Sequence, residues 1–355
     1  MKQAIAALTT PRISLQGRVI ETTIRFGNGA LDQARTFTSK GGQTIDKRVK
    51  LVSGKIVVTD TPLTYMRQDF SVKESIHIAG NGMATAEIQL WNLNDRSASE
   101  IESKGLEVKL SAGWEGKMGE LFSGKIASVT RTKSDAGSTD IITTLYCLGG
   151  FLIQQTEVYQ ETVQNDDVRS FLARLAQFMG LTLSIDSEVV GLVENTTFND
   201  NPLKILTKLG SQFKFTFYWT ETLLIVKALL NPFQVKIVQN YSPTNGLLDI
   251  PVVTERGVDL KVFLDPQLRS GDGFTLDSKF ANFNIGNLNY VNRVRGQNIN
   301  TFSAKVNNNR YQGVYQALEI SHEGSSHENT WQTSISAMGA VNFQDIKQTG
   351  RLDIA

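Results

Sequence analysis

Residues 83–150 alternate apolar and polar side chains along short segments, and turn-forming residues separate these segments. Residues 86–90 and 106–112 place apolar side chains at every second position, which is the period of a β-strand with one buried face. Residues 135–138, Asp-Ala-Gly-Ser, supply turn chemistry between two such segments. The alternation returns at residues 314–320. Many short strands joined in this way predict a mainly β chain built of barrels or sandwiches.

The middle of the chain has a different period. Residues 166–179 place their apolar side chains at helical spacing, with Asn165 as the expected N-cap and Gly180 as the stop. Pro202 stands at a favoured early position of a second helix. A small mixed α/β unit is therefore predicted. Its other elements are expected as a strand at 181–186, a helix at 203–212, and a hairpin of strands at 213–219 and 222–228.

These patterns predict three domains, two of them β and the middle one α/β. The predicted boundaries are 1–150, 151–235 and 236–355. Residues 231–262 are ambiguous, because prolines punctuate them as in a linker. The phrase LVSGKI at 51–56 is echoed by LFSGKI at 121–126. This echo indicates either two related hairpins or a chance similarity.

The composition bears on several classes of protein. Acidic and basic residues nearly cancel and leave a formal net charge of +1, whereas a general nucleic-acid binder carries a strong basic excess. This net charge is still compatible with a locally charged face or channel.

Cys147 is the only cysteine, so no disulfide can form within the chain. Its alternating neighbours predict that Cys147 is a small buried side chain. No apolar run reaches the roughly 20 residues of a membrane-spanning helix. We therefore expect a soluble chain, made in a reducing compartment, without membrane insertion.

No motif in the sequence indicates catalysis. His322 and His327 resemble a zinc-protease pair, but they are five residues apart, and one helical face needs a spacing of four. The sequence contains no phosphate-binding loop and no Gly-x-Ser-x-Gly nucleophile motif. The acidic pairs at 166–167 and 100–102 could serve as glycosidase carboxylates, although a helix start also favours the first pair. The sequence therefore predicts no catalytic, cofactor-binding or metal-binding residue, no cofactor, and no enzyme activity.

The order of the strands carries a family resemblance. A strand ends in Trp-Asn-Leu at 91–93, a strand ending in Ala-Gly follows at 105–113, the Leu-Phe-Ser-Gly-Lys-Ile strand comes at 121–126, and a further strand at 141–150. A second stretch, 315–337, has a strand ending in His-x-Gly and a Trp-x-Thr strand that returns. This order resembles the baseplate hub (tail hub) proteins of tailed bacteriophages, which are related to the hubs of contractile injection systems.

The resemblance implies a fold: mainly β with an α/β insert, in which two tube-like antiparallel β-barrel domains flank a small mixed α/β domain. It also implies a function. Such hubs form homotrimers with a pseudo-sixfold ring, which joins the hexameric tail tube to the trimeric central spike and leaves a lumen for tape measure and DNA. The polar segments 32–46 and 296–310 match nothing in the family pattern.

The resemblance further implies the partners and the location. The partners are other copies of the chain, tail tube or distal tube proteins, the central spike protein and the tape measure protein, with non-specific passage of DNA through the lumen. The location is the virion, at the tail tip or baseplate, with assembly in the host cytoplasm. Basic residues in the first β domain are interpreted either as a solvated strand face or as a channel lining. These residues are Lys104, Lys109, Lys117, Lys125, Arg131 and Lys133.

Two alternative functions are compatible with the sequence. A peptidoglycan- or glycan-cleaving tail enzyme needs convergent carboxylates or a metal site, and the sequence shows neither motif. A receptor-binding β module predicts an exposed aromatic patch. The four tryptophans, Trp91, Trp114, Trp219 and Trp331, are instead expected in or beside strands.

Overall fold

The computed structural model describes most of the chain between residues 17 and 339. The described residues are 17–26, 33–52, 55–76, 84–149, 157–219, 222–228, 237–254, 257–278, 282–283 and 312–339. Most of the described elements are strands, as the alternation predicted. None of the helices in these stretches is long and apolar enough to cross a membrane.

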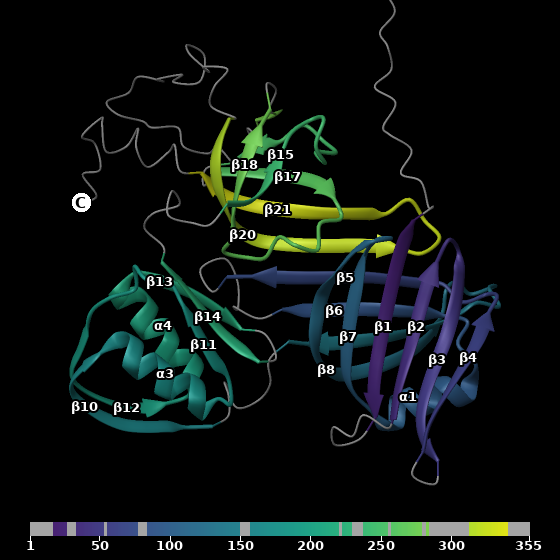
Figure 1. The fold of residues 1–355 in the computed structure, drawn as a ribbon, viewed down its shortest axis with the longest axis horizontal. Helices are drawn as coiled ribbons and strands as arrows, with labels where there is room; N and C mark the ends of the chain where they lie inside the picture. Colours follow the sequence, from purple (N-terminus) through teal and green to yellow (C-terminus); the bar gives the residue numbers. More distant parts are fainter. Residues whose placement is uncertain are drawn as a thin grey trace, which may run out of the picture.

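The described residues of the first β region form nine strands and one helix (Figure 1). The strands are β1 (Arg18–Phe26), β2 (Gln33–Lys40), β3 (Gln43–Val52), β4 (Lys55–Leu63), β5 (Gln68–Ser75), β6 (Thr85–Trp91), β7 (Gly105–Trp114), β8 (Lys117–Lys133) and β9 (Ile141–Leu148), and helix α1 (Asp95–Lys104) lies between β6 and β7. All pairs among these strands are antiparallel. The strands enclose an apolar core that includes Ile20, Ile88, Leu110 and Leu145. The apolar alternation of the sequence therefore forms this core.

The strands of the α/β unit form small sheets of their own (Figure 1). It contains β10 (Tyr159–Asp167), α3 (Val168–Phe178), β11 (Thr182–Ile185), β12 (Leu192–Asp200), α4 (Pro202–Phe213), β13 (Phe215–Trp219) and β14 (Leu223–Ala228). β10 pairs with β12, while β11, β14 and β13 form a second small sheet. The two helices bury Phe171, Leu175, Leu206 and Leu209 against these strands. The predicted helices, strand and hairpin are present in the predicted order, whereas β10 and β12 were not predicted.

The second β region continues the same sheet. Its strands are β15 (Ile237–Tyr241), β16 (Val252–Val253), β17 (Gly257–Phe263), β18 (Gly273–Asp277), β19 (Asn282–Phe283), β20 (Gln312–Ser325) and β21 (Trp331–Gly339). β20 pairs with β5 of the first β region over seven residue pairs. The main path through the sheet runs β19-β16-β17-β21-β20-β5-β6-β9-β8-β7-β1-β2-β3-β4. The two β regions are therefore joined by backbone hydrogen bonds, which the sequence did not predict.

Several local predictions need correction. Helix α3 begins at Val168, and its N-cap is Asp167, whose side chain accepts from the backbone N–H groups of Arg169 and Ser170. The predicted cap, Asn165, lies in β10, because that strand extends to the first residue before the helix. Part of the ambiguous segment 231–262 forms β15, β16 and β17 rather than a linker.

The echoed phrases do not form two related hairpins. The first phrase spans the end of β3 and the start of β4, whereas residues 121–126 lie inside the continuous strand β8. The similarity therefore has no common structural basis. Residues 296–310, His77, and the glycine pairs at 27–29 and 80–82 lie outside the described residues.

Candidate assembly surfaces

Strand β4 forms one end of the large sheet. It pairs with β3 on one side, and the described part of the chain places no strand on its other side. Eight of its nine residues are exposed. Unpaired backbone N–H and C=O groups along such an edge are able to bind a strand of another chain. The edge hairpin, which we define as β3 and β4, is therefore a candidate site of assembly.

The outer face of the edge hairpin carries exposed apolar side chains beside the charged Lys47 and Asp60. In the β3–β4 register, Ile45, Ile56 and Val58 share one face, and they are 45, 68 and 49% exposed. Asp46 points to the opposite face and is buried. Single exposed apolar residues are common, but three on one face beside an unpaired edge indicate a protein contact.

A buried ion pair lies beneath the edge hairpin. Arg35 of β2 donates from Nε and Nη2 to the two carboxylate oxygens of Asp46 at 2.8 and 2.6 Å, and both side chains are 2% exposed. Arg48 Nε donates to the same carboxylate at 3.1 Å. Arg35 also donates to Ser97 Oγ at 2.8 Å, and its Nη1 lies 3.9 Å from Glu100. Because Ser97 and Glu100 belong to α1, this cluster holds the hairpin against the helix.

Neither the inward polar residues of β2 and β3 nor helix α1 was expected from the sequence. Residues 33–46, which matched no family pattern, form β2 and the start of β3, and their inward positions hold Arg35 and Asp46 as well as the apolar Phe37. The segment 95–104 forms α1 although little of it is apolar. A signal was present, because Asn94 caps the helix by accepting from the Ser97 N–H at 2.8 Å.

A second surface is polar and crosses both β regions. In β17, β21, β20, β5 and β6 one face of the sheet is buried and apolar, whereas the alternate residues point outward. The strand registers align these outward residues from β17 to β6. We call this surface the polar face. It consists of Asp259, Lys261, Gln332, Ser334, Ser336, Glu319, Ser321, Glu323, Asp69, Ser71, Lys73, Ser75, Thr85, Glu87 and Gln89, and Phe263, Met338 and Trp91 lie on the same side at its margins.

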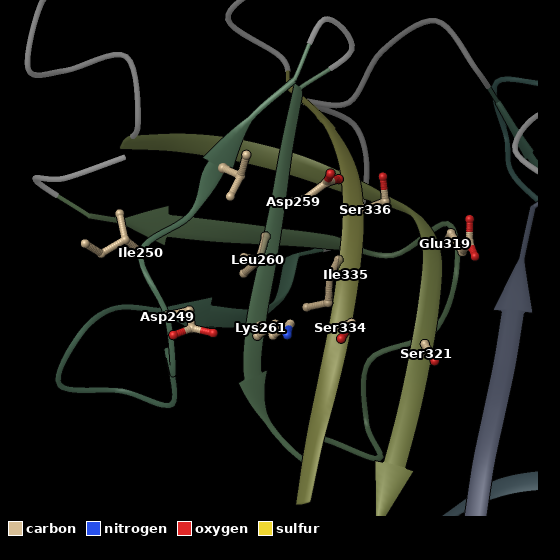
Figure 2. A pocket seen from close by; sticks show the side chains of 11 residues that line it. Asp249, Ile250, Asp259, Leu260, Lys261, Glu319, Ser321, Ser334, Ile335 and Ser336 are labelled. Carbon is tan, nitrogen blue, oxygen red and sulfur yellow. The ribbon is translucent and has the colours of Figure 1, made fainter. Parts of the chain in front are cut away.

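The polar face is hollowed by two shallow grooves. The larger has a volume of about 750 Å³ and crosses β17, β21 and β20. Figure 2 shows Asp259, Ser336 and Glu319 along it, with Asp249 on its far side. The smaller, about 230 Å³, lies where β20 meets β5 and β6. Neither groove gathers a metal site, since the described residues contain no group of three or more His, Cys, Asp or Glu that could hold a metal ion.

Glu74 of β5 is buried where the two β regions meet. Its Oε1 accepts from the backbone N–H of Ser270 at 3.0 Å, and its Oε2 lies 3.4 Å from Nη1 of Arg269. Arg269 also donates to the backbone carbonyl of Leu121 in β8 at 3.1 Å. Burial raises the pKa of Glu74 above its ordinary value, and the charge of Arg269 offsets only part of this effect. The segment between β17 and β18 is thereby fixed to the first β region.

The α/β unit contacts the large sheet beside this junction. Tyr218 of β13 packs with Ile76 and Leu318 in a small apolar cluster. Lys227 of β14 lies 3.9 Å from Asp272 of the second β region. Ile76 follows β5 and Leu318 lies in β20, and both are buried. Met338 of β21 packs against the same cluster, so the unit contacts the sheet where β5, β20 and β21 come together.

We expect Glu74→Gln to change the pH dependence of stability. A carboxylic acid whose folded-state pKa is raised stabilises the fold fully below its ordinary pKa of 4.5, and this contribution falls as the pH rises through the raised value. Glutamine keeps an acceptor for Ser270 but has no charge. The variant should therefore gain stability relative to the wild type as the pH rises from 4.5 to neutrality, measured by urea unfolding. A profile parallel to that of the wild type, as expected for the exposed Glu188→Gln control, would contradict this account.

The residues that the sequence singled out are mostly structural. His322 lies in β20, is fully buried, and its Nδ1 is 2.9 Å from Oγ1 of Thr333. Burial, and then the charge of Arg269, lower the pKa of His322 to about 3. His327 lies in the turn before β21, with its Nδ1 2.8 Å from Ser326 Oγ. The two histidines therefore contact separate hydroxyl groups, one in a strand and the other in a turn.

The acidic pairs have structural contacts as well. Asp166 accepts from Arg174 at 2.6 Å, while Asp167 caps α3. Glu100 belongs to the cluster beneath the edge hairpin. Among the basic residues, Lys109 pairs with Glu120 and Arg131 with Asp95. Both pairs are partly exposed, so the solvated strand face and the channel lining remain alternative predictions. Of the tryptophans, Trp219 and Trp331 are buried and Trp91 and Trp114 are half-buried in strands.

Cys147 has the buried position that the alternation predicted. It is 2% exposed in the core of the first β region, and burial raises its pKa to about 12. Because the thiolate is the reactive form, we expect no labelling of the native chain by maleimide, with full labelling in urea. Rapid labelling of the folded chain would show that the core opens.

The sequence comparison decides the family. Residues 83–295, which are more than half of the chain, match the family described as baseplate hub gp41. The chain belongs to this family of baseplate hub proteins. A baseplate hub protein is a structural component of the virion tail, so the resemblance noted from the strand order is confirmed. No curated protein sequence matches the chain.

Several solved structures are similar to the hub chain. A tail protein from Neisseria meningitidis MC58 shares 10% identity and a TM-score of 0.49, over 84% of this chain and 96% of that one. The 43 kDa tail protein of prophage MuSo2 from Shewanella oneidensis shares 7% identity and a TM-score of 0.48, over 84 and 97%. The E. coli c3393 protein, a component of the type VI secretion system, shares 9% identity and a TM-score of 0.46, over 77 and 73%. At these TM-scores the assignment rests on the family match.

Proposed function

We propose that this hub chain forms a homotrimeric ring with pseudo-sixfold symmetry that joins the hexameric tail tube to the trimeric central spike. The ring leaves a lumen for tape measure protein and DNA. The observation that carries this proposal is the continuous sheet, which runs through both β regions and ends in the exposed, unpaired strand β4. A subunit with two β regions in one sheet is suited to contribute two wall segments to a ring.

Ring closure gives the open edge a partner. A heterologous contact repeated around a closed ring covers the same edge in every subunit. In a free subunit, β4 and the apolar side chains of the edge hairpin stay exposed and favour aggregation. Burial of Ile56 and Val58 at a subunit contact would contribute about 1.5–3 kcal/mol each. The role of the chain is then geometric and needs no catalysis.

We also propose the domain division 1–150, 151–235 and 236–355 and the partners that the resemblance implied. The first and last domains supply the ring, and the α/β domain is attached to the sheet at Tyr218 and Lys227. The partners are tail tube or distal tube proteins, the central spike protein and the tape measure protein, with assembly in the host cytoplasm.

Native mass spectrometry and negative-stain microscopy of the purified chain test this function. The chain is measured alone and mixed with the tail proteins encoded beside it. A threefold species or a ring, formed alone or only with tube or spike protein, is the expected result. A chain that stays monomeric in every mixture, yet hydrolyses peptidoglycan, would overturn the proposal in favour of the tail enzyme.

A further inference from the structure

Residues 269–272, Arg-Ser-Gly-Asp, form a tight turn between β17 and β18. The backbone N–H of Asp272 donates to the carbonyl of Arg269 at 3.0 Å, and the carboxylate of Asp272 accepts from the backbone N–H of Arg269 at 3.1 Å. Gly271, the third residue, has a φ of +87°, which glycine adopts at this position of a turn without steric cost. We call this segment the junction turn.

Both β regions bind the junction turn. In the first, the carboxylate of Glu74 accepts from the backbone N–H of Ser270 at 3.0 Å, and Ser270 Oγ donates to the backbone carbonyl of Glu74 at 2.9 Å. In β20 of the second, the Ala317 carbonyl accepts from the Gly271 N–H at 2.7 Å, and Gln316 Nε2 donates to the Gly271 carbonyl at 3.1 Å. The junction turn is therefore held firmly by the sheet.

The α/β unit reaches the junction turn at Gly271. A Cβ atom at this position would come within 3.3 Å of Cγ of Lys227 and 3.5 Å of Cε1 of Tyr218, so glycine lets both side chains pack over the turn. The Nζ atom of Lys227 lies 3.9 Å from Oδ1 of Asp272 in the turn and 3.8 Å from Oδ1 of Asp186 in its own unit. Lys227 is thus a charged contact between the α/β unit and the junction turn.

Each charge of this contact would keep a partner if the α/β unit moved away. Lys227 would keep Asp186, whereas Asp272 would keep the backbone N–H of Arg269. The unit also has an apolar core separate from the cores of the two β regions. Its apolar contact with the sheet, among the described residues, is the small cluster around Leu318. Parts of a chain that are joined by a small contact are expected to move relative to one another.

We infer that the junction turn and Lys227 form a releasable contact that holds the α/β unit against the sheet. In the docked state, Lys227 bridges the unit and the turn. In a second, less populated state, the unit leaves the sheet while it and both β regions stay folded. This contact is a property of the single chain and does not depend on the proposed ring. It allows the α/β unit to change its position without a change in the sheet.

Labelling of a thiol placed in the contact measures release. Leu318→Cys puts this thiol in the cluster between β20 and the α/β unit, where Leu318 is 6% exposed. Cys147, in the core of the first β region, reports opening of the sheet in the same sample. Because local opening needs less free energy than global unfolding, the thiol at position 318 should react with maleimide faster than Cys147.

A change at Lys227 makes this test specific. Lys227→Met keeps most of the aliphatic stem and removes the charge, so labelling at position 318 should accelerate by about fivefold, the effect of losing one ion pair, while labelling of Cys147 stays unchanged. Lys227→Arg keeps the charge and should label at the wild-type rate. The matched control is Lys204→Met, which removes an exposed lysine that pairs with Asp200 inside the same unit, and it should also label at the wild-type rate.

Three results would overturn the inference. An unchanged rate at position 318 in Lys227→Met would mean that Lys227 does not hold the unit. Equal acceleration at position 318 and at Cys147 would mean that the substitution destabilises the whole chain. A thiol at position 318 that reacts no faster than Cys147 in any variant would mean that the α/β unit does not leave the folded sheet.

Discussion

Asp46→Ala is expected to destabilise the hub by about 3–5 kcal/mol, the cost of removing one partner of a buried ion pair. The substitution would leave the Arg35 guanidinium, whose side chain is 2% exposed, without the carboxylate that it contacts at 2.6 and 2.8 Å. Arg48 would lose the same partner. Urea unfolding at neutral pH measures the change in the free energy of unfolding. Helix α1 should also lose contacts, because Arg35 donates to Ser97 of that helix.

Two further variants make this prediction specific. Asp60→Ala removes an exposed carboxylate from the same hairpin and should change stability by less than about 0.5 kcal/mol. Arg35→Met combined with Asp46→Leu replaces both charges by apolar groups, which is often neutral or stabilising. A double variant as unstable as Asp46→Ala would mean that the packing of this site, and not the unpaired charge, causes the loss.

Ile56→Asp with Val58→Asp is expected to abolish ring formation while the subunit stays folded. Two aliphatic side chains that a subunit contact would bury contribute about 1.5–3 kcal/mol each, so the association constant should fall by at least about 100-fold. Because Ile56 and Val58 are 68 and 49% exposed in the single chain, its unfolding free energy should change little. Native mass spectrometry measures the species, and urea unfolding measures the fold.

The control for this prediction is Val190→Asp. Val190 is 64% exposed but belongs to the α/β unit, away from the edge hairpin. This variant should assemble like the wild type. If the Ile56 and Val58 variant also assembled normally, the edge hairpin would be excluded as the subunit contact and another edge of the sheet would have to close the ring.

Local patterns predicted the elements that are apolar on one side. Helix α4 was expected from Pro202 and its apolar spacing, and it begins at that residue with Asn201 as its N-cap. Strand β6 was expected from its alternating Ala86, Ile88 and Leu90, which are all buried. The position of Cys147 followed from the same alternation. In these segments each residue contributes to burial through its own hydrophobicity, so neighbours along the chain suffice for a prediction.

Polar segments were predicted poorly for a physical reason. Arg35 and Asp46 are buried because each neutralises the other, and neither side chain alone indicates an inward position. Helix α1 buries only Ser97, Ala98 and Ile101, too few apolar residues to give a helical period. In both cases the stabilising contact joins residues that are distant in sequence. A single sequence does not show such contacts.

The sequence by itself determined the mainly β class, the α/β insert and the hub family, because hydrophobic period, turn chemistry and strand order are local. The tertiary structure alone decided that β20 pairs with β5, which makes one sheet of two β regions. It also decided that β4 is an edge of the sheet among the described residues and that the polar face is continuous. Strand pairing depends on backbone hydrogen bonds that any residue except proline is able to form, and so it leaves little trace in the side chains.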